Sequence, residues 1–289
     1  MSTRQRTVAL GDGVAGVRTA GTGRAPGAVP IGLARVVLEL KAFSRNREAV
    51  VFTFAFPVMI LVLFGSIFHG ELGSTGVDFR QYMVAGIMAS GVMSVSFQTL
   101  AFAIALEQDD GTLKRLAGTP MPKAAYFIGK LGMVLVVGLL EVAVTLAIGV
   151  LAYGLDMPAT ASRWLTLAWV FVLGISACSL VGIAYSRVIR NVRAAAAVVT
   201  PPFIFLQFVS GVYFVYTELP EWLQRVGAVF PLKWMAQGLR SVFLPDSFRV
   251  AETAGSWEHG TTALVLAAWL VGGFVASALV FRWRGRGDA

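Results

Sequence analysis

The chain has few side chains that could perform covalent or metal chemistry, and they lie far apart. The two histidines, His69 and His259, are separated by most of the chain, and the single cysteine, Cys178, lies inside an apolar run. A metal centre needs several ligands close together, and a disulfide needs a second cysteine. The sequence also has no GxxxxGK[ST] phosphate-binding loop. We therefore expect no catalytic or metal site and no cofactor bound by this chain, and interpret Cys178 as a packing residue.

One short segment gathers charged side chains between two long apolar runs. It reads EQDDGTLKRLAGTP, from Glu107 to Pro120, and we call it the polar island. The pattern predicts a short helix with Thr112 as its cap, ended by Gly118 and Pro120. Leu113 and Leu116 would share one face of it. Such a helix suits docking onto another protein. The alternative is a tight connecting loop whose charges face water.

The composition predicts a membrane protein. Hydrophobic residues make up 56% of the chain and charged residues only 14%, whereas about a quarter of a soluble domain is charged. Six apolar runs reach the roughly 20 residues that a helix needs to cross about 30 Å of hydrocarbon. They are Ala49–Phe68, Tyr82–Leu106, Tyr126–Tyr153, Trp164–Ser186, Ala194–Tyr216 and Thr261–Phe281.

The positive charges predict the orientation of these spans. Of the 24 lysines and arginines, eighteen lie before the first span, in residues 107–130, or in the segments that follow the fourth and sixth spans, and six lie in the other segments. The positive-inside rule therefore places both termini and the polar island in the cytoplasm. We expect a multi-pass protein of the bacterial plasma membrane.

The segments outside the spans are expected to differ in character. Residues 1–30, rich in Gly, Ala, Thr and Arg, are interpreted as a disordered cytoplasmic tail, and residues 284–289 as a second tail. Between them, residues 31–283 are expected to form one six-span transmembrane domain. Its first part, IGLARVVLELKAFSRNREAV, mixes apolar and charged positions as an amphipathic helix at the membrane surface does; the alternative is a plain basic flank.

The segment between the fifth and sixth spans predicts two short helices rather than a soluble domain. Pro220 and Pro231 are each suited to the first turn of a helix. Apolar positions could share one face of each helix, so both could dip into the outer leaflet as re-entrant helices. Trp222 and Trp234 would then be aromatic residues at the membrane interface.

Two ordered motifs resemble the permease subunits of type 2 ABC exporters, the group that includes daunorubicin-resistance-like drug efflux permeases. In that family the second span ends in a pattern like E-R-E-x-G-T-L-x-x-L-x-x-T-P-x-P, and G-K opens the third span. The polar island follows this order, and Gly129-Lys130 follows it; Gln108 and Asp109 depart from the usual Arg and Glu. The second motif is SGVYFVYTELPEWLQRVGAVFPLKWMAQGLRSVF, which ends in the family's Leu-Arg with Arg240.

The resemblance implies an all-α integral membrane fold with six transmembrane helices, an amphipathic interfacial helix before them and two re-entrant helices before the last. It implies a homodimer, or a heterodimer with a similar permease, above two copies of a separate ABC ATPase subunit that holds ATP and Mg²⁺. The polar island would be the coupling helix, seated in a groove of that ATPase. Its contact residues would be Glu107, Asp109, Gly111, Thr112, Leu113, Lys114, Arg115 and Leu116.

The fifth span and Glu141 are candidates for the transport path. Pro201-Pro202 should loosen the fifth span, which the resemblance places beside the dimer axis. The candidate path residues are Glu141, Phe203, Phe205, Gln207 and Phe208. A carboxylate within a span is costly, so Glu141 should face protein or water, either attracting a cationic cargo or joining helices. The phenylalanines could instead face lipid.

The function that these observations favour is export of hydrophobic or amphiphilic drugs, antibiotics or lipids, driven by ATP that the partner hydrolyses. A polysaccharide or glycolipid exporter of the same family is the alternative. An ion-driven secondary transporter should show several charges within its spans and paired broken helices, and an intramembrane enzyme should show converging reactive groups. The sequence has neither pattern. It does not identify the cargo or the composition of the dimer.

Overall fold

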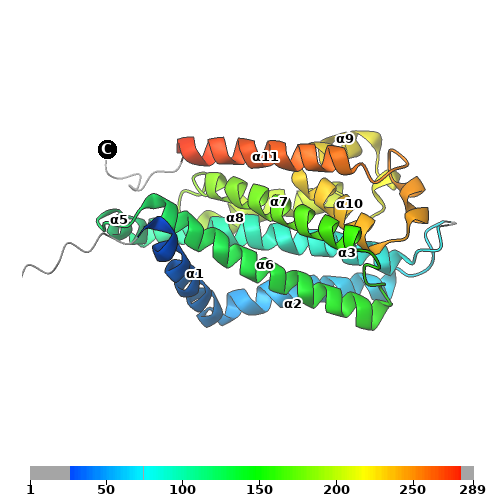
Figure 1. Cartoon of the computed structure of the whole chain (residues 1–289), viewed down its shortest axis with the longest axis horizontal. Helices are drawn as coiled ribbons and strands as arrows, with labels where there is room; N and C mark the ends of the chain where they lie inside the picture. The colour runs from blue at the N-terminus through cyan, green and yellow to red at the C-terminus, as the bar shows by residue number, and fades with distance from the viewer. Residues whose placement is uncertain (1–26, 74, 281–289) are drawn as a thin grey trace, which may run out of the picture.

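The computed structural model describes residues 27–73 and 75–280, so residues 1–26 and 281–289, which include most of the two expected tails, lie outside the described part. Every regular element in the described part is helical, as expected (Figure 1). Six helical segments are long and apolar enough to cross a membrane: α2 (Arg47–Ile67), α3–η1–α4 (Phe79–Asp109), α6 (Lys123–Tyr153), α7 (Ala161–Tyr185), η2–α8 (Val192–Val209) and α11 (His259–Val280).

The long helices run side by side, and the short elements gather at the two ends of the bundle (Figure 1). The short helix α5 (Thr112–Ala117) lies at one end, which we call the island end. The turn between α2 and α3 and the 3-10 helix η4 (Asp246–Ala251) lie at the opposite end.

The second span is the centre of the bundle, and its middle is not α-helical. Most of its length is buried, whereas α2 and α11 are largely exposed, as helices that face lipid would be. Between α3 (Phe79–Met93) and α4 (Leu100–Asp109) the chain forms a π-helix, η1 (Ser94–Thr99). A π-helix inside a span is rare and often marks a functional position. Gly182 of α7 lets η1 pack closely, since a Cβ there would lie 2.8 Å from the carbonyl oxygen of Phe97.

The expected surface helix is present as α1 (Ala28–Arg45) and packs across the start of α6 (Figure 1). Glycines allow this close crossing: a Cβ at Gly32 would lie 2.7 Å from Ile128, and one at Gly132 would lie 2.4 Å from Val36. The side of α1 away from α6 exposes apolar residues, including Leu33 and Leu38. An amphipathic helix with a free apolar side suits a membrane surface.

The fifth span is shorter than the sequence predicted. Helix α8 (Ala195–Val209) ends at Val209, not near Tyr216, because the chain turns at Gly211, whose φ of +70° is accessible to glycine at little cost. The Gly211 carbonyl then accepts hydrogen bonds from the Tyr82 hydroxyl (3.1 Å) and Arg240 Nη1 (3.3 Å). After the turn, Val212, Tyr213, Val215 and Tyr216 are buried against the bundle and Phe214 is exposed, and none of them continues helix α8.

Two short helices follow, as expected, but the second is internal. Helix α9 (Glu221–Val229) leaves Trp222 exposed, whereas every residue of α10 (Pro231–Phe243) is buried, and α10 packs against α3, α7 and α11. The prediction that Trp234 is an interfacial aromatic residue is wrong. Its indole Nε1 donates to the Ala228 carbonyl (2.7 Å), so the backbone between the two helices holds it inside.

Candidate functional site

The polar island forms a short helix, α5, at the end of the second span. Gly111, with φ +74°, turns the chain between α4 and α5 and is the N-cap, so the prediction that Thr112 caps the helix is wrong. The capping oxygen comes instead from Asp110, whose Oδ1 accepts from the Thr112 amide at 2.8 Å. The hydrogen bond from the Thr112 side chain holds the pKa of Asp110 below its ordinary value, and nearby Arg115 adds to this.

The two leucines of α5 do not present a common docking face. Leu113 is 3% exposed and packed into the chain, whereas Leu116 is only partly buried. Lys114 and Arg115 are exposed, and Arg115 Nη2 donates to the Thr112 hydroxyl at 3.1 Å. The surface that α5 offers to another molecule is therefore mainly charged, with Leu116 as its apolar part.

Glu107 turns away from the island surface into a cluster of charges that joins three helices. Its Oε1 lies 2.6 Å from Lys130 Nζ, and its Oε2 accepts from the Tyr126 hydroxyl at 2.7 Å. Lys130 also donates to Glu39 (2.7 Å), which pairs with Arg35 (3.0 Å). We call these five residues the ion cluster. They connect α4, the start of α6 and the surface helix α1, so Glu107 acts as an internal link instead of the expected surface contact.

Gly129 and Lys130, noted in the sequence as a Gly-Lys pair, each have a defined part in this cluster. A Cβ at Gly129 would lie 2.6 Å from Cγ of Arg35, so glycine permits the approach of that side chain. Lys130 is almost fully buried and supplies the positive charge between two carboxylates. A buried cation is tolerated when it is paired and hydrogen-bonded in this way.

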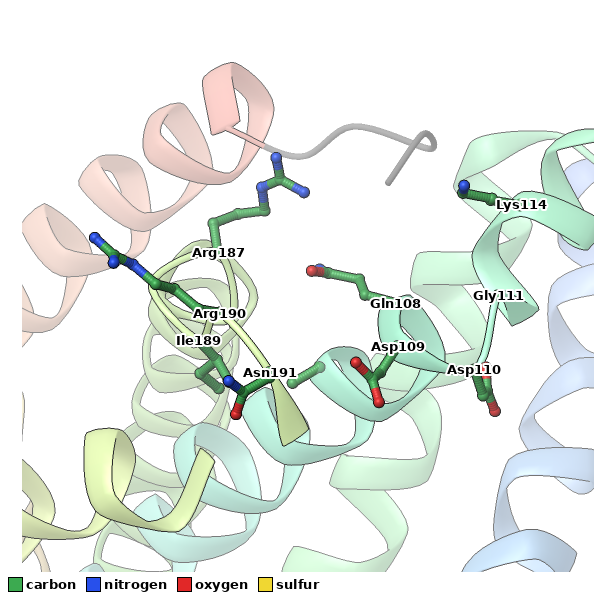
Figure 2. A pocket seen from close by; sticks show the side chains of 10 residues that line it. Gln108, Asp109, Asp110, Gly111, Lys114, Arg187, Ile189, Arg190 and Asn191 are labelled. Carbon is green, nitrogen blue, oxygen red and sulfur yellow. The ribbon is translucent and has the colours of Figure 1, made fainter. Parts of the chain in front are cut away.

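A polar cleft of about 380 Å³ opens between the island and the loop that follows α7 (Figure 2). We call it the island cleft. Gln108 and Asp109 lie on one side, and Lys114 on α5 bounds another (Figure 2). The facing wall is the loop from Arg187 to Asn191. In the sequence, the arginines of this loop indicated only how the spans are oriented in the membrane. The lining residues are Ala105, Gln108, Asp109, Asp110, Gly111, Lys114, Arg187, Ile189, Arg190 and Asn191.

The island cleft presents both signs of charge and an unused hydrogen-bond donor. Acidic groups come from the end of α4, and cationic groups from α5 and the facing loop. Within the described residues, the buried Nε2 of Gln108 has no hydrogen-bond partner. Because a buried donor without a partner is unfavourable, the cleft can stabilise an inserted polar group. The arrangement can therefore receive a side chain or a helix end of a partner protein.

The five residues expected to line a transport path do not lie on one surface. Glu141 is buried against Gly91 of α3, where a Cβ would lie 1.9 Å from its Oε1. Its Oε1 accepts from Thr145, and its Oε2 has no partner in the described part. Phe203 and Gln207 are also buried. Phe205 and Phe208 are 47% and 44% exposed, so the structure separates the five into an internal and an outward-facing group.

A larger cavity of about 510 Å³ lies next to the ion cluster and was not found from the sequence. We call it the amphiphilic cavity. Its walls carry three phenyl rings, and its polar groups come from the π-helix, from the ion cluster and from Asn46 and Thr53 at the start of α2. The lining residues are Glu39, Ala42, Phe43, Asn46, Ala49, Phe52, Thr53, Ser94, Gln98, Thr99, Phe102, Ala103, Leu106, Glu107, Lys130, Met133, Val192, Ala195 and Ala196.

The sequence feature from which this cavity could have been predicted is the run of polar residues in the second span. Ser94 lines the cavity, whereas Gly91 and Ser96 of the same span are packed inside the bundle. Gln98 lies in the π-helix and lines the cavity, and its Nε2 donates to the Thr200 hydroxyl at 3.2 Å. Thr200 directly precedes Pro201-Pro202, so the two irregular helices are joined at this point.

At the opposite end of the bundle, Arg240 ties α10 to its surroundings. It is fully buried, its Nε pairs with Glu252 Oε1 at 2.7 Å, and its guanidinium lies 4.6 Å from the centre of the Tyr82 ring. Lys233 on the same helix lies over the Trp234 ring, 3.5 Å from its centre, and burial lowers the pKa of Lys233 to about 8. This outer segment is held by its own internal charges and, within the described residues, forms no metal-ligand group.

Pro220 and Pro231 occupy the expected positions at the starts of the two outer helices. Pro231 is the first residue of α10, and Pro220 is the N-cap of α9. A proline suits such a position because its missing N–H would have no partner within the helix. Both residues therefore position the outer segment, and neither contributes to the island cleft or the amphiphilic cavity.

Comparison with known proteins decides the family. The model of the family described as "ABC-2 type transporter" matches residues 34–244, which include α5, the ion cluster, the island cleft and α10. The chain belongs to the ABC-2 type transporter family. It is therefore a type 2 ABC permease, a multi-pass membrane protein of a transport system.

Two relatives from Escherichia coli (strain K12) share about a quarter of the aligned residues with this chain. The protein named "Probable multidrug ABC transporter permease YbhR" is 26% identical over 178 residues, which cover 59% of this chain and 46% of that protein. "Inner membrane transport permease YadH" is 24% identical over 200 residues, which cover 65% of this chain and 74% of that protein. The match thus spans about half the length of the first relative.

Proposed function

We propose that this type 2 permease is the membrane-spanning subunit of an ATP-driven exporter, and that a separate ATPase subunit docks at the island end. Two ATPase copies, which hold ATP and Mg²⁺, would serve two permease chains, either identical or similar. The observation that carries the proposal is the mechanical continuity of α5. This exposed helix joins α4 through one glycine turn, and Glu107 of α4 is tied to α6 and α1 through the ion cluster.

This continuity supports a coupling role for α5. A displacement of α5 by a docked ATPase would pass to the second span directly, and to the third span and α1 through two charge-assisted contacts shorter than 3 Å. The island cleft, directly beside α5, would receive an element of the ATPase. Contacts with charges of both signs favour correct orientation of the two partners.

The island end would face the cytoplasm of a bacterial cell. Eighteen of the 24 lysines and arginines lie in the segments expected on this side, including the four of residues 107–130, and the positive-inside rule makes this the cytoplasmic side. The name of the YadH relative refers to the inner membrane, which supports the plasma membrane as the location of this chain.

The amphiphilic cavity supports a hydrophobic or amphiphilic cargo: a drug, an antibiotic or a lipid. Its volume of about 510 Å³ lies within the range of about 300–1,000 Å³ that small-molecule sites occupy. Aromatic and aliphatic walls that also carry polar groups match a molecule with an apolar body and a polar head. The YbhR relative is named as a multidrug permease, which agrees with this cargo class. Saccharide or glycolipid cargo is the alternative.

The test is reconstitution of the permease with candidate ABC ATPases in lipid nanodiscs. We expect co-purification with one of them and stimulation of its ATP hydrolysis by amphiphilic compounds. Phe102→Ala, which removes an aromatic wall of the cavity, should reduce this stimulation severalfold, whereas Val271→Ala on the exposed side of α11 should not. Stimulation by saccharides alone would support the alternative cargo, and failure to bind any ATPase would contradict the proposed function.

A further inference from the structure

A groove separate from the island cleft and the amphiphilic cavity runs along the outside of the bundle. It lies between α6 and α11, with α7 as its floor, and has a volume of about 560 Å³. We call it the lateral groove. Its lining is apolar except for Lys123 and two serines. The lining residues are Lys123, Ala124, Phe127, Ile128, Leu131, Ser176, Leu180, Leu270, Phe274, Ser277 and Ala278.

The groove exists because α11 contacts α7 closely but stands away from α6. A Cβ at Gly273 would lie 2.9 Å from Cβ of Leu180, and Ser277 Oγ donates to the Leu180 carbonyl at 2.7 Å. Small residues, Ala124 on α6 and Ala278 on α11, leave the space beside this contact open. The hollow is thus set by the backbone packing of α7 and α11.

The length of the groove matches one leaflet of a bilayer. On α6 its lining extends from Lys123 to Leu131, and on α11 from Leu270 to Ala278. Eight residues of α-helix rise about 12 Å, close to the roughly 15 Å that is half of a hydrocarbon core. Lys123 is the first residue of α6 and marks the island end of the groove. The apolar part therefore begins at the membrane boundary and ends near the midplane.

The charge of the groove lies at the boundary end. Lys123 is exposed, and no acidic residue in the described part forms an ion pair with it. It is also the one charged residue of the lining. A lysine at a membrane surface attracts anionic head groups with about 1 kcal/mol, which is about fivefold in preference. An apolar channel that ends at such a cation is complementary to an anionic phospholipid.

We propose that the lateral groove holds one phospholipid, with an acyl chain along the helices and an anionic head group at Lys123. The lipid would fill the space between α6 and α11 and would be retained more strongly than the surrounding bilayer lipid. Head groups with net negative charge, such as phosphatidylglycerol, would be preferred over phosphatidylcholine, because the choline cation opposes Lys123. This site is independent of the ATPase and of the exported cargo.

Native mass spectrometry of the full chain, purified from nanodiscs with equal amounts of phosphatidylglycerol and phosphatidylcholine, tests the proposal. The wild-type protein should retain one phospholipid per chain, enriched about fivefold in phosphatidylglycerol. Lys123→Gln should remove the enrichment but keep the lipid. Ala278→Phe, which fills the groove, should remove most of the bound lipid.

Matched control variants distinguish an effect of the groove from general effects of a lost lysine or of added side-chain bulk. Lys41→Gln removes one exposed lysine from α1, and Val271→Phe adds bulk to an exposed position of α11 outside the lining; both should retain the enriched lipid. Equal retention in Ala278→Phe and the wild type would overturn the proposal. So would displacement of the lipid by an exported compound, or loss of the dimer in Ala278→Phe without loss of lipid, since the occupant would then be cargo or a second chain.

Discussion

At each end of the bundle of this permease, a buried cation is paired with acidic residues. At the island end Lys130 lies between Glu39 and Glu107, and at the opposite end Arg240 pairs with Glu252. Such groups are tolerated because each is paired, and removal of one partner leaves the other as a buried, uncompensated charge. The effect of a substitution at these positions should therefore depend on which partner remains.

Lys130→Met should destabilise the protein strongly. It leaves Glu39 and Glu107 with Arg35, 3.0 Å and 3.7 Å away, as their one remaining cation in the cluster; complete loss of the partner of a buried charge costs about 3–5 kcal/mol, which is the upper limit for this change. The midpoint of thermal unfolding in nanodiscs should fall by several degrees. Arg225→Ala is the control, because its pair with Glu221 is exposed and should contribute little. Equal midpoints for Lys130→Met and the wild type would exclude a stabilising role for the ion cluster.

Lys233 should make the stability of the outer segment depend on pH. Burial lowers its pKa from the ordinary 10.5 to about 8, so the unfolded state binds the proton more tightly. Stability should consequently rise as pH increases from about 8 to about 10.5. The difference in thermal midpoint between Lys233→Met and the wild type, measured at pH 7, 8, 9 and 10, isolates this group. A difference that does not change with pH would contradict the prediction.

At the scale of the elements, the two leucines of α5 differ in exposure. Leu113 packs into the bundle, whereas Leu116 stays accessible to a partner. Leu116→Asp should abolish co-purification with the ATPase while the yield in the membrane fraction stays the same, because Leu116 is the apolar part of the proposed docking surface. Leu113→Asp places a charge in a packed position and should lower the yield as well. Lys114→Ala with Arg115→Ala should weaken ATPase binding less, and change its dependence on salt. Pull-down beside membrane yield measures all three.

If Leu116→Asp binds the ATPase normally, α5 does not dock, and the alternative of a plain connecting loop is supported. Gly111→Ala provides a further comparison on the same element. It should impair coupling without removing the docking side chains, because φ at this position is +74° and disfavours any residue with a Cβ.

Helices were easier to predict from the sequence than the direction of their side chains. Long apolar runs identified six spans, since hydrophobic length is a local property. The fifth span was predicted too long because Val212 and Val215 are apolar, yet they are buried after a turn. The ion cluster could not be predicted, because Glu39, Glu107 and Lys130 lie far apart in the sequence. The π-helix at Ser94–Thr99 also has no sequence signal comparable to a proline.

At the scale of the whole molecule, we predict that the exposed side of α8 is the surface for a second copy. Phe205 and Phe208 expose nearly half of their area, and the proposed function needs two permease chains. In a Cys178→Ala background, Phe205→Cys should form a disulfide-linked dimer, visible on a non-reducing gel. Val271→Cys on α11 should not. Cross-linking at residue 271 and not at 205 would place the dimer interface on the other side of the bundle.

The burial of α10 has a consequence for biosynthesis. This helix carries Lys233 and Arg240, and their acidic partners, Glu258 and Glu252, are both translated after it. A ribosome-bound chain that ends before residue 252 therefore has two cations and no means to neutralise them within the bundle. The outer segment must wait in water or at the lipid surface until the start of α11 emerges. The residues that lead into α11 thus complete the fold of a segment that precedes them in the chain.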